Sequence, residues 1–309
     1  MSALRRAVGV AIALTFCLIV LGASVRATGS GLACPDWPTC YGHWLPLPGE
    51  IPDAAGYSYV QVMLEWLHRL IAGVILGPLI LLIGGLAWRV RSEQPRMPGY
   101  AAALVLLLLV QAGLGGLTVL DQNSPWSVAL HLGTALLLFS ILWLIFARTA
   151  AAEPGPRVGG GLALVTWLLA LGAMVSAAMM TKSGASLACA SWPLCDGALL
   201  PDLGDAAVRL NLTHRLLAAA TALASLALFL RLRGAPELRR LAGGALAAMA
   251  VEIALGGLVV VLALPIWSGL LHQAFGVLTF GLLSLLMWRA VAPAPASLED
   301  PAHVRLSRA

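Results

Sequence analysis

The sequence predicts an all-α integral membrane protein with eight transmembrane helices, arranged as two tandem four-helix bundles related by a pseudo-two-fold axis along the membrane normal. Three observations predict it: eight long apolar runs, arginines gathered in alternate loops, and an internal repeat. Of the 309 residues, 60% are hydrophobic and 11% are charged, whereas about 25% of an ordinary soluble domain is charged. This composition excludes a soluble globular enzyme and a disordered protein. The net charge of +5 does not indicate a nucleic acid partner, because the arginines flank apolar runs.

Each of the eight apolar runs is long enough to cross a bilayer, which takes about 20 helical residues. Backbone polar groups in lipid must be paired within helices or a closed barrel. A barrel is excluded because the runs are unbroken and do not alternate. A signal peptide is the alternative for the first run, but that run has a counterpart in the second half of the chain. The runs lie near residues 7–25, 60–88, 99–120, 128–147, 160–181, 207–230, 239–263 and 267–289.

The distribution of charge predicts the orientation in the membrane. Basic residues lie mainly in the N-terminal tail and after the even-numbered runs, as with Arg91, Arg148 and Arg233, whereas the other loops are mostly acidic or neutral. The exceptions are Arg26, Lys182 and Arg209. Because cytoplasmic loops carry the excess of Lys and Arg, we expect a multi-pass protein of a bacterial cytoplasmic membrane with both termini in the cytoplasm.

The chain contains two copies of one unit. GSGLACPDWPTC at 29–40 recurs as GASLACASWPLC at 184–195, and LHRL at 67–70 recurs as THRL at 213–216. Each half has an even number of spans, so the halves share one topology, as in parallel repeats related by an axis along the membrane normal. The predicted parts are a first half at 1–147, a linker at 148–159, a second half at 160–290 and a tail at 291–309.

Four histidines occupy repeated places within the apolar runs, two in each half. These are His68, His131, His214 and His272. Ionisable groups are costly in a membrane and face the bundle interior, and two neutral imidazoles on facing helices can form an axial pair for a haem iron. A packing role and a zinc site are the alternatives, but no Cys or carboxylate completes a four-ligand zinc site in both halves. We expect one pair within each half, and solvated positions for His43 in a loop and His303 in the tail.

Residues beside these histidines distinguish the two halves. Arg69 and Arg215 each follow a histidine and could pair with haem propionates or reach toward the interface. Glu65 lies three residues before His68 and shares its helix face, whereas Asn211 takes the same place in the second half. The first half is therefore predicted to be the reactive one.

Other residues in the apolar runs also differ or repeat. Gln111 in the first half corresponds to Glu252 in the second, where the carboxyl group indicates either proton movement or a hydrogen bond to a neighbouring helix. Glycines recur in the third and seventh runs, as Gly115-Gly116 and Gly256-Gly257, where they favour either a porphyrin lying close to the backbone or simple helix packing.

The cysteines form two Cys-x5-Cys pairs, Cys34 with Cys40 and Cys189 with Cys195, in loops on the predicted outer side. That side is oxidising in bacteria, which favours disulfides within each loop. A zinc site is the alternative, although this spacing is not typical of one. Cys17 lies inside the first run and is interpreted as a packing residue.

Taken together, these motifs resemble the haem A synthase family of the CtaA type. The resemblance rests on RATGSGLACPDWPTC at 26–40, EWLHRL at 65–70, His131, His272 and the second cysteine loop, and it covers both halves. It implies a bacterial membrane enzyme that oxidises the C8 methyl of haem O to the formyl group of haem A, with the oxygen coming from water or O2. The haem O would come from a haem O synthase.

The resemblance also implies roles for individual residues. His68 and His131 would hold the substrate haem with Glu65 assisting, and His214 and His272 would ligate a permanent haem b. Cys34 and Cys40 would form the disulfide linked to activity. The sequence leaves open the electron-transfer partner and the oligomeric state. The competing function is a di-haem b-type cytochrome that passes electrons between quinol and a partner. A membrane thiol oxidoreductase and a transporter fit less well, because the chain has no Cys-x-x-Cys and its repeats carry ligands rather than broken helices.

Overall fold

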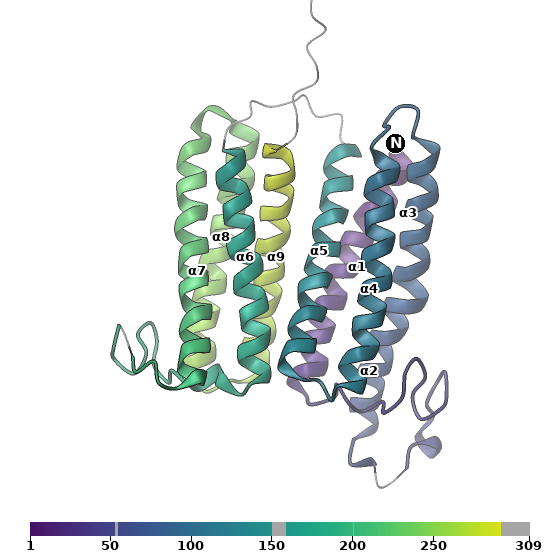
Figure 1. Cartoon of the computed structure of the whole chain (residues 1–309), viewed down its shortest axis with the longest axis vertical. Helices are drawn as coiled ribbons and strands as arrows, with labels where there is room; N and C mark the ends of the chain where they lie inside the picture. Colours follow the sequence, from purple (N-terminus) through teal and green to yellow (C-terminus); the bar gives the residue numbers. More distant parts are fainter. Residues whose placement is uncertain (53–54, 150–158, 200, 292–309) are drawn as a thin grey trace, which may run out of the picture.

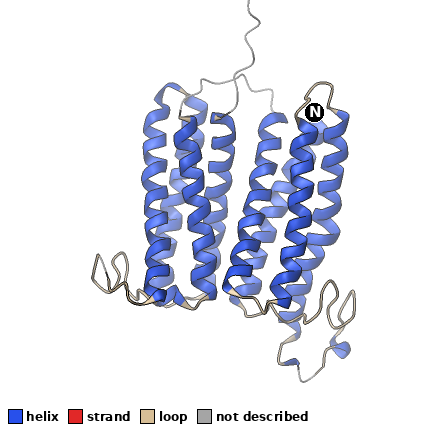
Figure 2. Cartoon of the chain, viewed as in Figure 1, coloured by secondary structure: helices blue, strands red, loops and turns tan. Residues whose placement is uncertain are grey.

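The computed structural model describes residues 1–52, 55–149, 159–199 and 201–291. Within these ranges, eight helices are long and apolar enough to cross a membrane, as the sequence predicts. Figure 2 shows that the spans are helical and that loops join their ends. Of the predicted linker, residues 150–158 lie outside the described residues, as do residues 292–309 of the predicted tail, which include His303.

The first four spans are α1 (Ser2–Ala27), a composite of α2 (Tyr59–Leu70), the π-helix η3 (Ile71–Leu76) and α3 (Gly77–Arg89), then α4 (Met97–Leu120) and α5 (Pro125–Thr149). The last four are α6 (Gly160–Lys182), α7 (Ala206–Arg231) with the 3-10 helix η5 (Leu232–Gly234), α8 (Pro236–Val261) and α9 (Ile266–Ala290). Two further 3-10 helices, η1 (Pro48–Glu50) and η4 (Ala185–Leu187), lie in the cysteine-containing loops.

Helix ends follow local chemistry. The Ser58 hydroxyl accepts a hydrogen bond from the Gln61 amide at the start of α2, and the Asp205 carboxylate accepts one from the Ala207 amide at the start of α7. Such N-caps satisfy donors that have no partner in the first helical turn. The seventh span ends at Val261, two residues before the predicted boundary at 263. The physical reason is a turn in which Ala263 and Leu264 have φ values of 55° and 65°, which no helix tolerates.

The π-helix in the second span coincides with a proline. Pro78 has no amide hydrogen, and its ring crowds the carbonyl of residue 74 one turn earlier. Widening the preceding turn, η3, relieves this conflict, and single π-turns of this kind are frequent at functional sites. Residue 224 corresponds to Pro78 in the second half and is alanine, and α7 remains a regular α-helix there. The two repeats therefore differ in shape just beyond the first histidine.

The helices of the two halves lie side by side. Figure 1 shows α6 to α9 on one side and α1 to α5 on the other, with both cysteine loops at the end opposite the N-terminus. At the boundary, α5 packs on α6 and α9, and α1 packs on α9. Buried aromatic rings fill this boundary, including Phe139 of α5 and Phe280 of α9. The Trp288 indole of α9 donates a hydrogen bond to the Ser140 carbonyl of α5 at 2.8 Å, which further joins the halves.

Gly281 of α9 provides a test of this boundary. A Cβ at this position would lie 2.9 Å from the Phe139 ring and 3.0 Å from the Trp143 indole nitrogen, whereas a Cβ at Gly269 of the same helix would meet nothing within 4 Å. Overpacking costs about 1–3 kcal/mol, which outweighs the helix propensity gain of about 1 kcal/mol for Gly→Ala. We expect Gly281→Ala to lower the Tm of the detergent-solubilised protein and Gly269→Ala to leave it unchanged or raise it. Equal Tm values for the two variants would contradict this packing.

Candidate functional site

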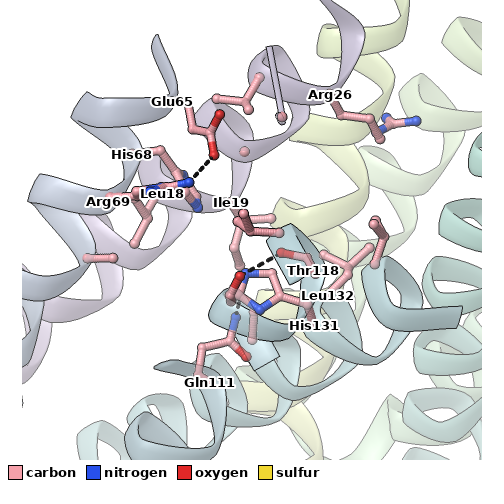
Figure 3. Close-up of a pocket in the computed structure, with 18 of the residues that line it drawn as sticks. Leu18, Ile19, Arg26, Glu65, His68, Arg69, Gln111, Thr118, His131 and Leu132 are labelled. Atoms are coloured by element: carbon pink, nitrogen blue, oxygen red, sulfur yellow. Dashed lines mark hydrogen bonds and ion pairs between the residues drawn. The ribbon is translucent and has the colours of Figure 1, made fainter. Parts of the chain in front are cut away.

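A cavity of about 620 Å³ lies within the first half of the chain. Figure 3 shows the residues around it: Glu65, His68 and Arg69 on α2, Gln111 and Thr118 on α4, His131 on α5, and Leu18, Ile19 and Arg26 on α1. The second half supplies part of the wall through Ala177, Ala178 and Lys182 of α6 and Gln273 of α9. The cavity is therefore completed by packing between the halves.

The two first-half histidines both line this cavity, as predicted for a pair. The Nδ1 atoms of His68 and His131 are buried and have no hydrogen-bond partner among the described residues. The Nε2 of His131 lies 3.2 Å from the Gln111 side-chain nitrogen, which can donate to it. Glycines make room for both rings: a Cβ at Gly22 would lie 3.1 Å from His68 Cε1, and one at Gly115 would lie 3.3 Å from His131 Cε1.

The two second-half histidines lie against each other and are held differently. The ring centroids of His214 and His272 are 6.4 Å apart, with the ring planes at 86°. The Nδ1 of His214 lies 3.0 Å from the Ala173 carbonyl oxygen, and the Nδ1 of His272 lies 2.9 Å from the Glu252 carbonyl oxygen. A carbonyl can only accept, so each Nδ1 carries the proton and each Nε2 keeps its lone pair. This is the orientation that metal-bound histidines usually have.

These positions fit haem ligation. A metal–imidazole nitrogen bond is about 2.0–2.1 Å, so two imidazoles on opposite sides of one metal have ring centres about 6 Å apart. The 6.4 Å between His214 and His272 matches that spacing. In the first half, His68 and His131 both line one cavity, and the Nε2 of His131 lies beside the Gln111 amide there. No group of three or more His, Cys, Asp or Glu side chains is placed to hold a metal ion within the described ranges, which argues against structural zinc.

Glu65 joins the cavity to the first cysteine loop. It is 4% exposed and forms an ion pair with Arg69, in which Nη2 lies 2.5 Å from Oε1. Its other oxygen, Oε2, accepts a hydrogen bond from the Cys34 amide at 2.9 Å. The sequence places Glu65 beside His68 but gives no indication of this link to the loop. Both carboxylate oxygens are therefore partnered, as an acid within a membrane span requires.

The arginines that follow the histidines hold the cysteine loops. The two terminal nitrogens of Arg69 donate to the carbonyl oxygens of Asp36, Thr39 and Cys34, in addition to the Glu65 contact. The terminal nitrogens of Arg215 donate to four carbonyl oxygens of the second loop. In the place of Glu65, the Asn211 amide donates to the carbonyls of Ala185 and Ser186. Both guanidinium groups are thus occupied by backbone oxygens, and pairing with propionates stays a prediction.

Each cysteine pair forms the predicted disulfide, Cys34–Cys40 with an S–S distance of 2.00 Å and Cys189–Cys195 with 1.95 Å. The Asp36 carboxylate closes the first loop by accepting hydrogen bonds from the Tyr41 and Gly42 amides and the Thr39 hydroxyl. Burial raises the pKa of Asp36, but these hydrogen bonds outweigh it and hold the pKa below its usual value.

The repeated glycines accommodate the protein's own rings. Gly115 and Gly256 lie against His131 and His272, and a Cβ at Gly256 would lie 3.0 Å from the ring. A Cβ at Gly116 would lie 3.3 Å from the Trp37 ring, and one at Gly257 would lie 3.0 Å from the Trp192 ring. These four glycines therefore position the histidines and seat the tryptophans of the cysteine loops, a role that neither of the two sequence-based interpretations described.

The structure also places three other residues that the sequence analysis considered. Cys17 is free and exposed on α1, so its interpretation as a packing residue is wrong, because the bundle leaves that face of the helix uncovered. Glu252 contributes its backbone carbonyl to His272, while its side chain lies close to Gly276, where a Cβ would meet Oε1 at 2.9 Å. His43 is a loop residue within 3.5 Å of Glu50, in agreement with its expected solvated position.

The sequence pattern of the COX15-CtaA family, described as cytochrome oxidase assembly protein, matches residues 5–284. The chain belongs to the COX15-CtaA family. The match spans both histidine pairs and both disulfides. As a member of this family with eight candidate spans, the chain is a multi-pass membrane protein.

Relatives that this chain matches over nearly their full length support this assignment. The chain is 34% identical to "Heme A synthase" of Symbiobacterium thermophilum over 307 residues, which covers 92% of this chain and 94% of the relative. It is 28% identical to "Heme A synthase" of Shewanella oneidensis, covering 89% and 93% of the two chains. It is also 28% identical to "Heme A synthase" of Geobacillus kaustophilus, covering 93% and 91%.

The disulfides of this COX15-CtaA protein can be tested by counting thiols. In the Cys17→Ser background, we expect a maleimide–polyethylene glycol tag to add no mass to the denatured, unreduced protein and four tags after reduction, because the remaining cysteines are paired. The further removal of Cys34 and Cys40 should leave two tags after reduction. Gel mobility gives the count. Four tags without reductant would show that neither loop is cross-linked.

Proposed function

We propose that this chain is a haem A synthase, an oxidoreductase that oxidises the C8 methyl group of haem O to a formyl group and so gives haem A for terminal oxidases. The family and the full-length relatives support the reaction. The assignment of different roles to the two halves rests on one observation, which is that the two histidine pairs have different hydrogen-bond partners. The second-half pair is fixed by backbone carbonyls, and the first-half pair lines a cavity with its Nδ1 atoms unpartnered.

The second half is suited to a permanent cofactor. In this proposal, His214 and His272 would hold haem b through Nε2, and their Nδ1 hydrogen bonds prevent either ring from turning away. A ligand pair that needs no rearrangement favours electron transfer over exchange. When bound, the haem groups supply the redox chemistry that oxidises an unactivated methyl, which amino-acid side chains cannot do.

The first half is suited to a substrate that must enter and leave. Here His68 and His131 hold haem O, and Gln111 provides a second partner for His131 Nε2 at 3.2 Å. The ring nitrogen therefore has a hydrogen bond available whenever the substrate is absent, which lowers the cost of releasing the product from a buried site. In the second half, His272 has no such arrangement with Glu252, whose contact is through the backbone.

Glu65 acts in this proposal from the wall of the substrate cavity. Its carboxylate is anchored by Arg69 and by the Cys34 amide, so it has a fixed position beside His68 and can stabilise positive charge or move a proton near the reacting group. The same contacts connect the carboxylate to the Cys34–Cys40 disulfide, and opening that disulfide would shift the group that holds Glu65. This is a physical route by which the disulfide affects activity.

The finer architecture belongs to the same proposal. The two halves, 1–147 and 160–290, are four-helix bundles related by a pseudo-two-fold axis along the membrane normal, in a bacterial cytoplasmic membrane. The termini are cytoplasmic and the disulfide loops are on the outer side, because the arginine-rich loops lie at the end of the bundle away from the cysteines. The substrate reaches the cavity through the lipid bilayer from a haem O synthase, and a separate partner exchanges electrons.

A di-haem b-type cytochrome that only transfers electrons is the alternative. It would account for two histidine pairs, but it does not require the halves to differ. Glu65 and Gln111 reach the first-half site, whereas Asn211 binds loop carbonyls and the Glu252 side chain makes no hydrogen bond to a histidine among the described residues. These differences favour a reactive first half and therefore the synthase.

The catalytic role of Glu65 is tested by Glu65→Gln in cells that supply haem O. We expect haem b to be retained and haem A formation to fall by about a hundredfold or more, which is the usual scale for loss of a positioned acid or base. Extraction and chromatography of the haems measure the products. Glu50→Gln, which changes a partly exposed loop carboxylate outside the cavity, is the control and should form haem A normally. Thiol counting on both variants verifies that the disulfides are intact, and unchanged product in Glu65→Gln would remove the residue from the reaction.

The permanent haem b is tested by His214→Ala and His272→Ala. Either variant should lose the low-spin haem b signal in the reduced-minus-oxidised spectrum, because one axial nitrogen is missing. His68→Ala and the exposed-loop variant His43→Ala should keep that signal. A spectrum lost in His68→Ala but kept in His214→Ala would place the permanent haem in the first half instead.

A further inference from the structure

Two basic side chains that the proposed reaction does not use line the substrate cavity. These are Arg26, in the last turn of α1, and Lys182, the last residue of α6. Both line the same cavity although they come from helices of different halves. Neither side chain makes an ion pair or donates a hydrogen bond within the described part of the chain, where the two acid–base contacts are Arg69–Glu65 and His43–Glu50. Two neighbouring cations without an anion are a ready site for carboxylates.

The position of Arg26 relates this pair to the histidines. Gly22, one turn earlier in α1, lies against the His68 ring, with 3.1 Å from its ideal Cβ to Cε1. Four helical residues advance about 6 Å along the axis, so Arg26 lies about 6 Å closer than Gly22 to the loop end of the bundle. A basic residue in the last turn of a helix also gains from the helix dipole, but that effect does not explain why two such residues from different halves meet on one cavity.

Other cations near the site are already occupied. The terminal nitrogens of Arg69 donate to three loop carbonyls and to Glu65, so binding a further anion there would break contacts that hold the cysteine loop. The equivalent of Arg26 in the second half, 155 positions later, is Thr181. The pair of free cations is therefore specific to the first-half cavity.

A different part of the cavity wall is apolar and faces outward. Val74 of the π-helix and Leu109 of α4 both line the cavity and are 63% and 64% exposed. In a membrane span, such exposed side chains contact lipid tails. The wall therefore combines cations at the loop end with an apolar surface that reaches the lipid, which matches a porphyrin that carries two carboxylates and a long hydrocarbon chain.

We propose that Arg26 and Lys182 bind the propionate carboxylates of the substrate porphyrin, so that the propionates point to the loop end and the hydrocarbon chain lies between Val74 and Leu109 toward the lipid. This inference rests on the proposed function. Because Lys182 comes from the second half, the substrate site is incomplete without both halves. The carboxylate pair also fixes how the porphyrin is rotated about the His68–His131 direction, and hence which edge methyl approaches Glu65.

The test compares two porphyrins, ferric protoporphyrin IX and its dimethyl ester, titrated into purified protein whose second-half haem b is already bound. We expect the Arg26→Gln/Lys182→Gln variant to bind the free acid about tenfold or more weakly, because charge-assisted hydrogen bonds are lost, and to bind the ester within about threefold of the unmodified protein. Absorbance of the added porphyrin gives the Kd. Arg209→Gln, which removes a cation bound to loop carbonyls away from the cavity, should change neither Kd.

Two further measurements separate the inference from the proposed function. The haem b spectrum must persist in each variant, and Lys182→Gln alone replaces the double variant if that spectrum is lost. His68→Ala/His131→Ala should abolish the titration, and an unchanged titration there would overturn both the first-half substrate site and this inference. If His68→Ala/His131→Ala abolishes the titration but Arg26→Gln/Lys182→Gln weakens binding of the acid and the ester equally, the first-half site stands. The carboxylate site alone is then overturned.

Discussion

The structure depends on the cost of placing ionisable groups inside a membrane. A charge or an unpaired polar group in the hydrocarbon region costs several kcal/mol, so each such group must have a partner or a purpose. Glu65 meets this requirement with Arg69 and the Cys34 amide, and His214 and His272 meet it with backbone carbonyls. The first-half histidines do not meet it through Nδ1, which remains buried and unpartnered. The cavity is therefore one of the places where buried polar atoms lack a protein partner among the described residues.

A repeated unit gives two sites of the same layout, and small changes then separate their properties. Proline at position 78 produces a π-turn beside the first site, and alanine at the equivalent position 224 leaves a regular helix beside the second. Gln111 contacts the Nε2 of His131 through its side chain, whereas Glu252 contacts the Nδ1 of His272 through its backbone carbonyl. These changes make the surroundings of the two histidine pairs unequal. The proposed function requires such a difference, because it keeps one haem and exchanges another.

Much of this arrangement was predictable because membrane spans and ligand repeats leave strong signals in a sequence. The eight spans, the placing of His68 and His131 on one cavity and of His214 beside His272, and both disulfides follow from apolar runs and repeated spacings. The hydrogen bonds of Arg69 to the cysteine loop could not be predicted, because an irregular loop conformation leaves no periodic signal in the sequence. Packing between the halves also leaves no periodic signal in the sequence. Arg26 and Lys182 were exceptions to the charge pattern, together with Arg209, and the sequence does not show that the first two line one cavity.

The packing between the halves also brings the second histidine pair close to the first-half cavity. His272 belongs to the second-half pair, and the next residue, Gln273, lines the first-half cavity. Ala177 and Ala178 of α6 line it as well, so two helices of the second half contribute to the wall of the first-half cavity. Because α9 packs on both α1 and α5, a change in the position of α9 alters both sites at once. If the two histidine pairs hold haems as proposed, this shared contact through α6 and α9 would favour electron transfer between them.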